Sequence, residues 1–206
     1  MELLIVRHGE TLWNDKGLLQ GQKDIELNDN GREMARKLAG KLKDIPIDMV
    51  YSSPLKRAYE TARLALGDRD IPVVTDERIK EISFGECEGI DYRSWKKSDS
   101  PYNSFFTSPD KYNPPKDGES LDEVIKRATD FVKTCIEPNA DKYDRMMVVA
   151  HGALNKGMMC YLENHGTETF WGDGLQDNCE ATVFEYDGQD WTLKSGSDGA
   201  VKRNAM

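Results

Sequence analysis

Short runs of apolar residues alternate along the chain with longer segments in which apolar positions follow a helical period. Three apolar runs cover residues 3–6, 48–51 and 146–150, and a short β-rich run covers residues 72–75. Continuous apolar runs of this length are typical of strands that are buried on both faces of a parallel sheet. Each of the first three runs leads through a polar or glycine-bearing corner into a helical pattern.

Helical periodicity is present in four segments. Met34, Leu38 and Leu42 recur at i, i+4 and i+8 and predict a helix over residues 30–43. The next helix is predicted over 53–67, with Ser53 as its N-cap and Pro54 at its first helical position. Two further helices are predicted over 120–135 and 153–163.

The order of these elements indicates a single domain over residues 1–206. Strands that alternate with helices predict a three-layer α/β/α fold with a mainly parallel central sheet. Residues 181–197 predict a β-hairpin around Asp187 and Gly188, and we expect residues 197–206 to be loose. Between residues 91 and 118 the regular pattern fails, and the prolines and aromatic residues there predict a long ordered loop with short helices.

Composition and charge restrict the function. The 206 residues are 38% hydrophobic and 32% charged, with a formal net charge of −9 and a pI of about 4.9. Such a chain is not expected to bind nucleic acid or an anionic membrane, although a locally positive pocket can take a small anion. The sequence shows neither a secretory signal nor an apolar stretch of ~20 residues, and its four cysteines form no CxxC pair. We therefore expect a cytoplasmic protein.

Candidate catalytic residues follow the three long apolar runs. Arg7 and His8 follow the first run, Arg57 lies on the first helical turn after the second, and His151 follows the third. Ligands of open α/β sheets bind outside the carboxyl ends of the strands, so we expect these four side chains to converge at one edge. Taken singly, each of them is more often a structural or solvent-exposed residue.

Together, the four residues indicate a phosphate site. Arg57 lies at the positive end of a helix dipole, where a cation is unfavourable unless an anion lies close by. Guanidinium groups match phosphate oxygens bidentately, and histidine can act as a covalent nucleophile. The chain has neither a P-loop nor an evident carboxylate cluster for Mg²⁺. The pattern therefore suits phosphoryl transfer to a nitrogen atom without a metal.

The leaving oxygen of a phosphate ester needs a proton, and Glu81 is a candidate general acid. It lies between the 72–75 run and a glycine turn, in a region that also holds Glu77, Glu86 and Glu88. A catalytic acid has to carry its proton near neutral pH, a state that burial or a nearby phosphate favours. From composition alone, any one of these residues is more often a surface carboxylate.

The motifs resemble those of the histidine phosphatase superfamily, in its phosphoglycerate-mutase-like branch (branch 1). Matching segments occur in order: VRHGETLWN, the spacing Q-G-x-x-D-x-x-L-x-x-x-G, VYSSPLKRAYETA, ISFGECEG, PKDGESLDEVIKRATDF and VVAHGAL. The resemblance implies that His8 becomes phosphohistidine and that Glu81 protonates the leaving group and then activates water. The phosphate-binding residues that it implies are Arg7, Asn14, Gln20, Gly21, Arg57 and His151. It implies no metal or organic cofactor.

The resemblance leaves the activity open between two enzymes. The first is a metal-independent phosphatase for a small organic phosphomonoester, and the second is a 2,3-bisphosphoglycerate-dependent phosphoglycerate mutase. ISFGECEG stands where the mutases carry a stretch like ERHYG, and Lys96 and Lys97 follow Glu81 too closely for the mutases' substrate segment. Both features favour the phosphatase. A non-catalytic phosphate-binding module is a third alternative, and a homodimer is an open alternative for the assembly.

The irregular segment bears on the choice of substrate. Tyr102, Phe105, Phe106 and Tyr112 either line a lid over the pocket or form a small core beneath the loop. A lid of this composition would favour an ester with an apolar or ring-bearing group. Sugar phosphates, α-ribazole phosphate, nucleoside monophosphates and phosphoglycerate remain as candidates.

Overall fold

A six-stranded sheet in the order β3-β2-β4-β1-β5-β6 forms the centre of the molecule. The computed structural model describes residues 1–195, so the expectation for residues 197–206 lies outside the described part. Strands β1 to β4 run parallel, whereas β5 is antiparallel to β1 and β6 to β5. The mainly parallel sheet and the closing hairpin are thereby confirmed. The strands are β1 (Glu2–Arg7), β2 (Met49–Ser52), β3 (Val73–Thr75), β4 (Arg145–Ala150), β5 (Ala181–Tyr186) and β6 (Trp191–Ser195).

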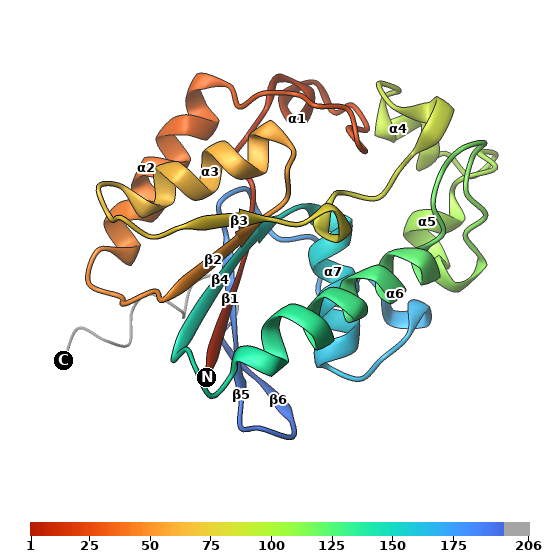
Figure 1. Ribbon diagram of the computed structural model, residues 1–206. Coiled ribbons are helices and arrows are strands. Elements are labelled where there is room, and N and C mark those ends of the chain that lie inside the picture. Colours follow the sequence, from red (N-terminus) through yellow and green to blue (C-terminus); the bar gives the residue numbers. More distant parts are fainter. Residues whose placement is uncertain (196–206) are drawn as a thin grey trace.

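Helices cover both faces of the sheet and complete the predicted three layers (Figure 1). Helices α2 and α3 pack on one face, and α6 and α7 pack on the other. The α-helices are α1 (Leu12–Lys16), α2 (Asp29–Leu42), α3 (Lys56–Leu66), α4 (Tyr92–Trp95), α5 (Ser104–Thr107), α6 (Leu121–Phe131) and α7 (Gly152–Leu162). One π-helical turn, Val132–Ile136, continues α6, and 3₁₀ turns cover Glu77–Ile79, Gly85–Cys87, Pro109–Lys111, Glu137–Asn139 and Thr167–Thr169.

The side chains of β1 explain why its sequence is continuously apolar. Leu4 and Val6 are buried among residues of α2 and α3, whereas Leu3 and Ile5 are buried among residues of α6 and α7. Successive side chains of a strand point to opposite faces, and both faces of this sheet are covered. The strand therefore lies inside the molecule, and its polar continuation emerges only at its carboxyl end.

The second predicted helix begins later than its sequence indicated. Helix α3 starts at Lys56, and its N-cap is Leu55, which forms no side-chain cap. The predictions of Ser53 as N-cap and Pro54 as first helical residue are therefore wrong. The Ser53 hydroxyl instead lies 2.7 Å from Nε2 of His151, so it contacts the residue that follows the neighbouring strand β4. Arg57 still lies on the first turn of α3, as predicted.

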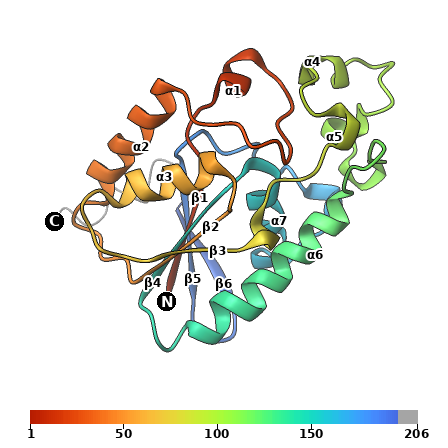
Figure 2. The ribbon, with the colours of Figure 1, turned by 45° about the horizontal axis from the view of Figure 1, so that its top comes forward.

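The segment 91–118 is an ordered loop that contains α4, α5 and one 3₁₀ turn, as predicted. Phe105 and Tyr112 are buried and pack with Trp95, with ring centroids 4.9–6.1 Å apart. Figure 2 shows α1, α4 and α5 at the end of the sheet where β1, β2 and β4 finish. The loop therefore flanks the edge at which the candidate catalytic residues emerge.

Candidate active site

His8 directly follows β1, and its ring is 2% exposed. Its Nδ1 lies 2.7 Å from the carbonyl oxygen of Gly9. A carbonyl can only accept a hydrogen bond, so Nδ1 carries the ring proton and Nε2 carries the lone pair. Nε2 accepts a hydrogen bond from Nε of Arg57 at 3.3 Å. Burial, followed by the charges of Arg57 and Arg7, holds the pKa of His8 well below its usual value.

His151 directly follows β4 and lies against the first histidine, with ring centroids 5.1 Å apart. Its Nε2 is 2.7 Å from the hydroxyl of Ser53. Its Nδ1 is buried and has no hydrogen-bond partner in the described part of the chain. Burial, with added repulsion from Arg57, holds the pKa of His151 well below its usual value. The ring is neutral near pH 7, and its unpaired nitrogen is available to a polar group.

The two predicted arginines are held by backbone carbonyls. Arg57 is fully buried and donates from Nη1 to the carbonyl of Lys23 at 2.7 Å and from Nη2 to that of Gly21 at 2.8 Å. Arg7 donates from Nη1 to the carbonyl of Gln176, and its buried Nε has no partner within residues 1–195. Burial lowers the pKa of Arg57 to about 10 and also lowers that of Arg7.

Arginine keeps its charge in proteins, so both guanidinium groups are cations at neutral pH. Within residues 1–195, neither Arg7 nor Arg57 forms an ion pair with a carboxylate. Buried charges are unfavourable unless they are paired. Two such cations without a carboxylate partner among the described residues favour the binding of an anion.

Glu81 reaches the same site from a different part of the fold. Its carboxylate accepts hydrogen bonds from the backbone N–H groups of Ile82 and Leu154 at 3.0 Å and of Ala153 at 3.3 Å. Ala153 and Leu154 belong to the first turn of α7, whose N–H groups have no partner inside the helix. The start of α7 thus orients the carboxylate of Glu81.

One cavity of about 660 Å³ connects these groups. Seven predicted residues line it, and they are Arg7, His8, Asn14, Gln20, Gly21, Arg57 and Glu81. The eighth, His151, is fully buried beside His8 and is not among the lining residues. Asn14 accepts a hydrogen bond from the backbone N–H of Thr11 at 3.1 Å, and Gln20 lies 3.0 Å from the Thr11 hydroxyl. The sequence therefore identified the residues that the fold brings together.

Other lining residues were not identified from the sequence as parts of the cavity. Trp13, Phe84, Tyr92 and Trp171 line it together with Phe105 and Phe106 of the loop. Lys96 also lines it and places its ammonium 5.0 Å from the ring centre of Tyr92 and 5.1 Å from that of Phe106. Phe105 lines the cavity and also belongs to the buried core, so the loop contributes side chains to both.

Two further residues, Asn178 and Gln176, contact the end of β1 at Arg7 and His8, and Asn178 also lines the cavity. The amide of Asn178 donates to the carbonyl of His8 at 2.8 Å, and Gln176 accepts from Arg7. His165, the third histidine, contacts Glu163 and Thr169 and does not line this cavity. In the described part of the chain, no three His, Cys, Asp or Glu side chains gather as a metal site would require, and no helix there could cross a membrane.

Comparisons with known proteins show the family. The model of the histidine phosphatase superfamily (branch 1) matches residues 3–199. This chain belongs to the histidine phosphatase superfamily. Putative phosphoserine phosphatase 2 of Hydrogenobacter thermophilus is 33% identical over 192 residues, which is 93% of this chain and 92% of that protein. Phosphoglycerate mutase-like protein 4 of Arabidopsis thaliana is 35% identical over 203 residues, which is 96% of this chain and 85% of that protein.

The solved structures agree on the fold. The crystal structure of a putative α-ribazole-5′-P phosphatase from Escherichia coli superimposes with a TM-score of 0.85 at 27% identity. The match covers 98% of both chains. The phosphoglycerate-mutase-like architecture expected from the motifs is therefore confirmed, and the relatives carry both phosphatase and phosphoglycerate mutase names.

Proposed function

We propose that the protein is a phosphatase that hydrolyses a small organic phosphomonoester through a phosphohistidine on His8. The observation that carries this proposal is the state of the His8 ring. Its Nδ1–H is fixed on the Gly9 carbonyl, its Nε2 has the lone pair, and its pKa lies well below the usual value. A neutral, oriented imidazole at a cationic cavity is the arrangement that an attack on phosphorus requires.

In the first step, Nε2 of His8 attacks the phosphorus and the ester bond breaks. Arg7, Arg57 and His151 would stabilise the negative charge on the phosphoryl oxygens, because preorganised donors in a buried site act more strongly than water does. Glu81 would give its proton to the leaving oxygen, so that an alcohol departs. The products of this step are the free alcohol, phosphohistidine and the carboxylate of Glu81.

In the second step, water attacks the phosphohistidine. The carboxylate of Glu81 takes one proton from that water, the P–N bond breaks, and the electron pair returns to Nε2 of His8. Inorganic phosphate leaves, and both residues regain their starting states. Glu81 thus acts as a general acid in the first step and as a general base in the second.

A phosphate-release assay tests this proposal. The enzyme is expected to release phosphate from p-nitrophenyl phosphate and from alkyl phosphates, in the presence of EDTA as well as in its absence. Short incubation followed by alkaline quenching is expected to trap a phosphoenzyme that acid destroys. His8→Ala is expected to lose both phosphate release and formation of the phosphoenzyme. Loss of turnover with the chelator, or a phosphoenzyme that persists in His8→Ala, would contradict the mechanism.

The mutase is the second candidate, because several relatives are named phosphoglycerate mutase or mutase-like. It predicts interconversion of 3- and 2-phosphoglycerate that 2,3-bisphosphoglycerate stimulates. Release of phosphate from both monophosphates without interconversion would exclude it. We favour the phosphatase because ISFGECEG stands where the mutases carry a stretch like ERHYG. Two relatives named phosphoserine phosphatase also support it.

The loop 91–118 would act as the substrate-facing wall of this site. Phe105 and Phe106 line the cavity, and the indole N–H of Trp171 donates to the carbonyl of Phe105. This wall supports an ester with an apolar or ring-bearing group. We also propose a cytoplasmic location, which is supported by the four free thiols that are typical of reducing compartments.

A further inference from the structure

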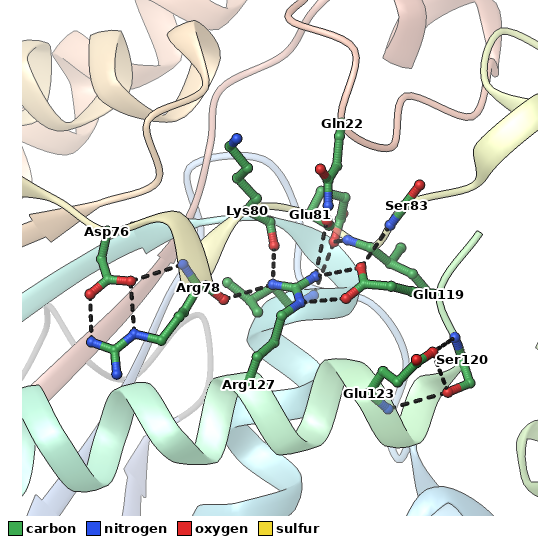
Figure 3. A network of polar contacts seen from close by, with 12 residues as sticks. Gln22, Asp76, Arg78, Lys80, Glu81, Ser83, Glu119, Ser120, Glu123 and Arg127 are labelled. Atoms are coloured by element: carbon green, nitrogen blue, oxygen red, sulfur yellow. Dashed lines mark hydrogen bonds and ion pairs between the residues drawn. The ribbon is translucent and has the colours of Figure 1, made fainter. Parts of the chain in front are cut away.

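Arg127, on α6, holds the backbone that leads to Glu81. Its Nη1 donates to the carbonyl of Arg78 at 2.7 Å and to that of Lys80 at 2.6 Å, and its Nη2 donates to that of Glu81 at 3.0 Å. Figure 3 shows these three carbonyl oxygens gathered around one guanidinium group. Because the guanidinium is planar and its donors are fixed relative to one another, the contacts define the path of this segment.

Glu119 completes the arrangement from the other side. Its carboxylate accepts from Nε and Nη2 of Arg127 at 2.7 and 3.0 Å, and it also accepts the backbone N–H of Ser83 at 2.9 Å. The side chains of Arg127 and Glu119 are only 17% and 21% exposed. This pair, which we call the Arg127–Glu119 clamp, therefore contacts the backbone both before and after the carboxyl of Glu81.

The need for a clamp follows from how the other site residues are positioned. Strands β1 and β4 end at Arg7 and Ala150, and their hydrogen-bonded pairing fixes the positions of His8 and His151, which follow directly. Strand β3 ends at Thr75, and residues 80–84 belong to no helix or strand. Glu81 thus has no regular element of its own to position it, although burial of Ile79 and Ile82 anchors the segment to the core.

The two ends of Glu81 are fixed by neighbouring helices. Helix α6 holds the backbone carbonyl of Glu81 through Arg127, and α7 holds its carboxylate through the N–H groups of Ala153 and Leu154. Helices α6 and α7 pack against each other on the same face of the sheet. The position of the acid relative to His8 is therefore determined by one rigid pair of helices.

We propose that Arg127, held in place by Glu119, is a positioning residue that aligns Glu81 for proton transfer to the leaving group. The inference rests on the proposed function, since it assigns to Arg127 the alignment of the general acid in that reaction. Arg127 does not line the cavity and is not expected to contact substrate. Misplacement of a catalytic group by about 1 Å can cost about 10²-fold in rate.

Two esters whose leaving groups differ in their need for a proton separate a positioning role of Arg127 from a merely structural one. A structural role would change kcat/KM equally for both esters. The phenolate of p-nitrophenyl phosphate departs without a proton, whereas the alkoxide of an alkyl phosphate needs one. Lysine at position 127 keeps the charge but has a single nitrogen and cannot span three carbonyls. Arg127→Lys is therefore expected to lower kcat/KM about 10²-fold for an alkyl phosphate and less than about threefold for p-nitrophenyl phosphate. Glu81→Gln is expected to show the same selectivity.

Arg78→Lys is the matched control. Its side chain pairs with Asp76 and Asp130 at 2.6 Å, and its contact with Arg127 is made by its backbone carbonyl. Arg78→Lys is expected to change the stability of the protein without changing the ratio of kcat/KM for the alkyl phosphate to kcat/KM for p-nitrophenyl phosphate. If Arg127→Lys is too unstable to assay, Glu119→Gln, which retains the shape of the carboxylate, is expected to show the same selectivity at smaller amplitude.

The outcomes separate this inference from the proposed function. The positioning role is overturned if Arg127→Lys or Glu119→Gln lowers kcat/KM equally for both esters, or does not lower it for either. In that case, selectivity in Glu81→Gln and loss of turnover in His8→Ala would leave the phosphatase proposal intact. Absence of phosphate release from both esters by the wild-type protein would instead overturn the proposed function.

Discussion

Nε of Arg57 lies 3.3 Å from Nε2 of His8, so a buried cation donates directly to the atom that carries the nucleophilic lone pair. The hydrogen bond is possible only while Nε2 is unprotonated. The charge of Arg57, after burial itself, is the largest cause that lowers the pKa of His8. In the proposed reaction, Arg57 would thus keep Nε2 of His8 unprotonated before a phosphate arrives.

The first prediction concerns the protonation of His8. Because its pKa lies well below 6.5, the His8 ring is expected to remain neutral, with the proton on Nδ1, in wild-type protein at pH 6. Arg57→Gln removes a neighbouring charge and is expected to raise the pKa of His8. Titration of the imidazole nitrogens by NMR measures both effects. An imidazolium spectrum for wild-type His8 at pH 6 would contradict the prediction.

The second prediction concerns stability at acid pH. The pKa values of His8 and His151 are depressed in the folded state, so below about 6.5 the unfolded chain binds more protons than the native protein does. Stability is therefore expected to fall as the pH drops below about 7, by up to about 1.4 kcal/mol per pH unit for each histidine. Urea unfolding between pH 5 and 8 measures this slope.

A pair of variants assigns the slope to the buried rings. His151→Asn is expected to reduce the slope of the unfolding free energy against pH by the contribution of one histidine, which is up to about 1.4 kcal/mol per pH unit. His165→Asn, at a partly exposed position outside the cavity, is expected to leave it unchanged. An equal slope in wild-type protein and His151→Asn would show that carboxylates, not this histidine, cause the loss.

The third prediction concerns Ser53, whose hydroxyl lies 2.7 Å from Nε2 of His151. Ser53→Ala leaves that buried nitrogen without its partner, which typically costs about 1–3 kcal/mol, and frees the ring to turn. Phosphate release is expected to fall about tenfold, as a loss of about 1.4 kcal/mol would cause. Ser52→Ala is the control, because the buried Ser52 hydroxyl donates to the adjacent Ser53 carbonyl and not to His151. Equal rates in the two variants would argue against this role.

These residues also show how far the sequence could lead. His8 and His151 were identifiable because each follows an apolar run, and parallel strands bring their carboxyl ends to one edge. Gln176 was not, because it lies 169 positions from Arg7 in a stretch without periodicity, and only tertiary packing joins the two. Arg127 lies in a segment that matches the family, yet its helical pattern gives no sign that it contacts a loop 46 positions away.

The fourth prediction concerns substrates with a second negative group. The ammonium of Lys96 lines the cavity between the rings of Tyr92 and Phe106. Lys96→Met is expected to raise KM several-fold for a phosphate ester that also carries a carboxylate and to leave KM for p-nitrophenyl phosphate nearly unchanged. Lys97→Met serves as the control, since Lys97 is exposed and does not line the cavity. An equal change of KM for both esters would show that Lys96 does not contact the second anion.

The last prediction concerns the close approach of two backbones next to His8. A Cβ added at Gly31 would lie 2.1 Å from the carbonyl oxygen of Glu10, and one added at Gly9 would lie 2.6 Å from the carbonyl oxygen of Gly31. Both obstacles are backbone atoms, so neither can move without shifting the turn that follows His8. Gly31→Ala is expected to destabilise the protein by about 1–3 kcal/mol, as overpacking typically does, and to lower activity.

Helix α2 provides the matched control for this substitution. A Cβ added at Gly40 meets no atom within 4 Å, and α2 extends from Asp29 to Leu42. Gly40→Ala is therefore expected to stabilise the protein by about 0.5–1 kcal/mol through helix propensity alone. Urea unfolding gives both free energies, and phosphate release gives the activity. If Gly31→Ala were stabilising like Gly40→Ala, the contact with Glu10 would not constrain the turn, and the position of His8 would depend on β1 alone.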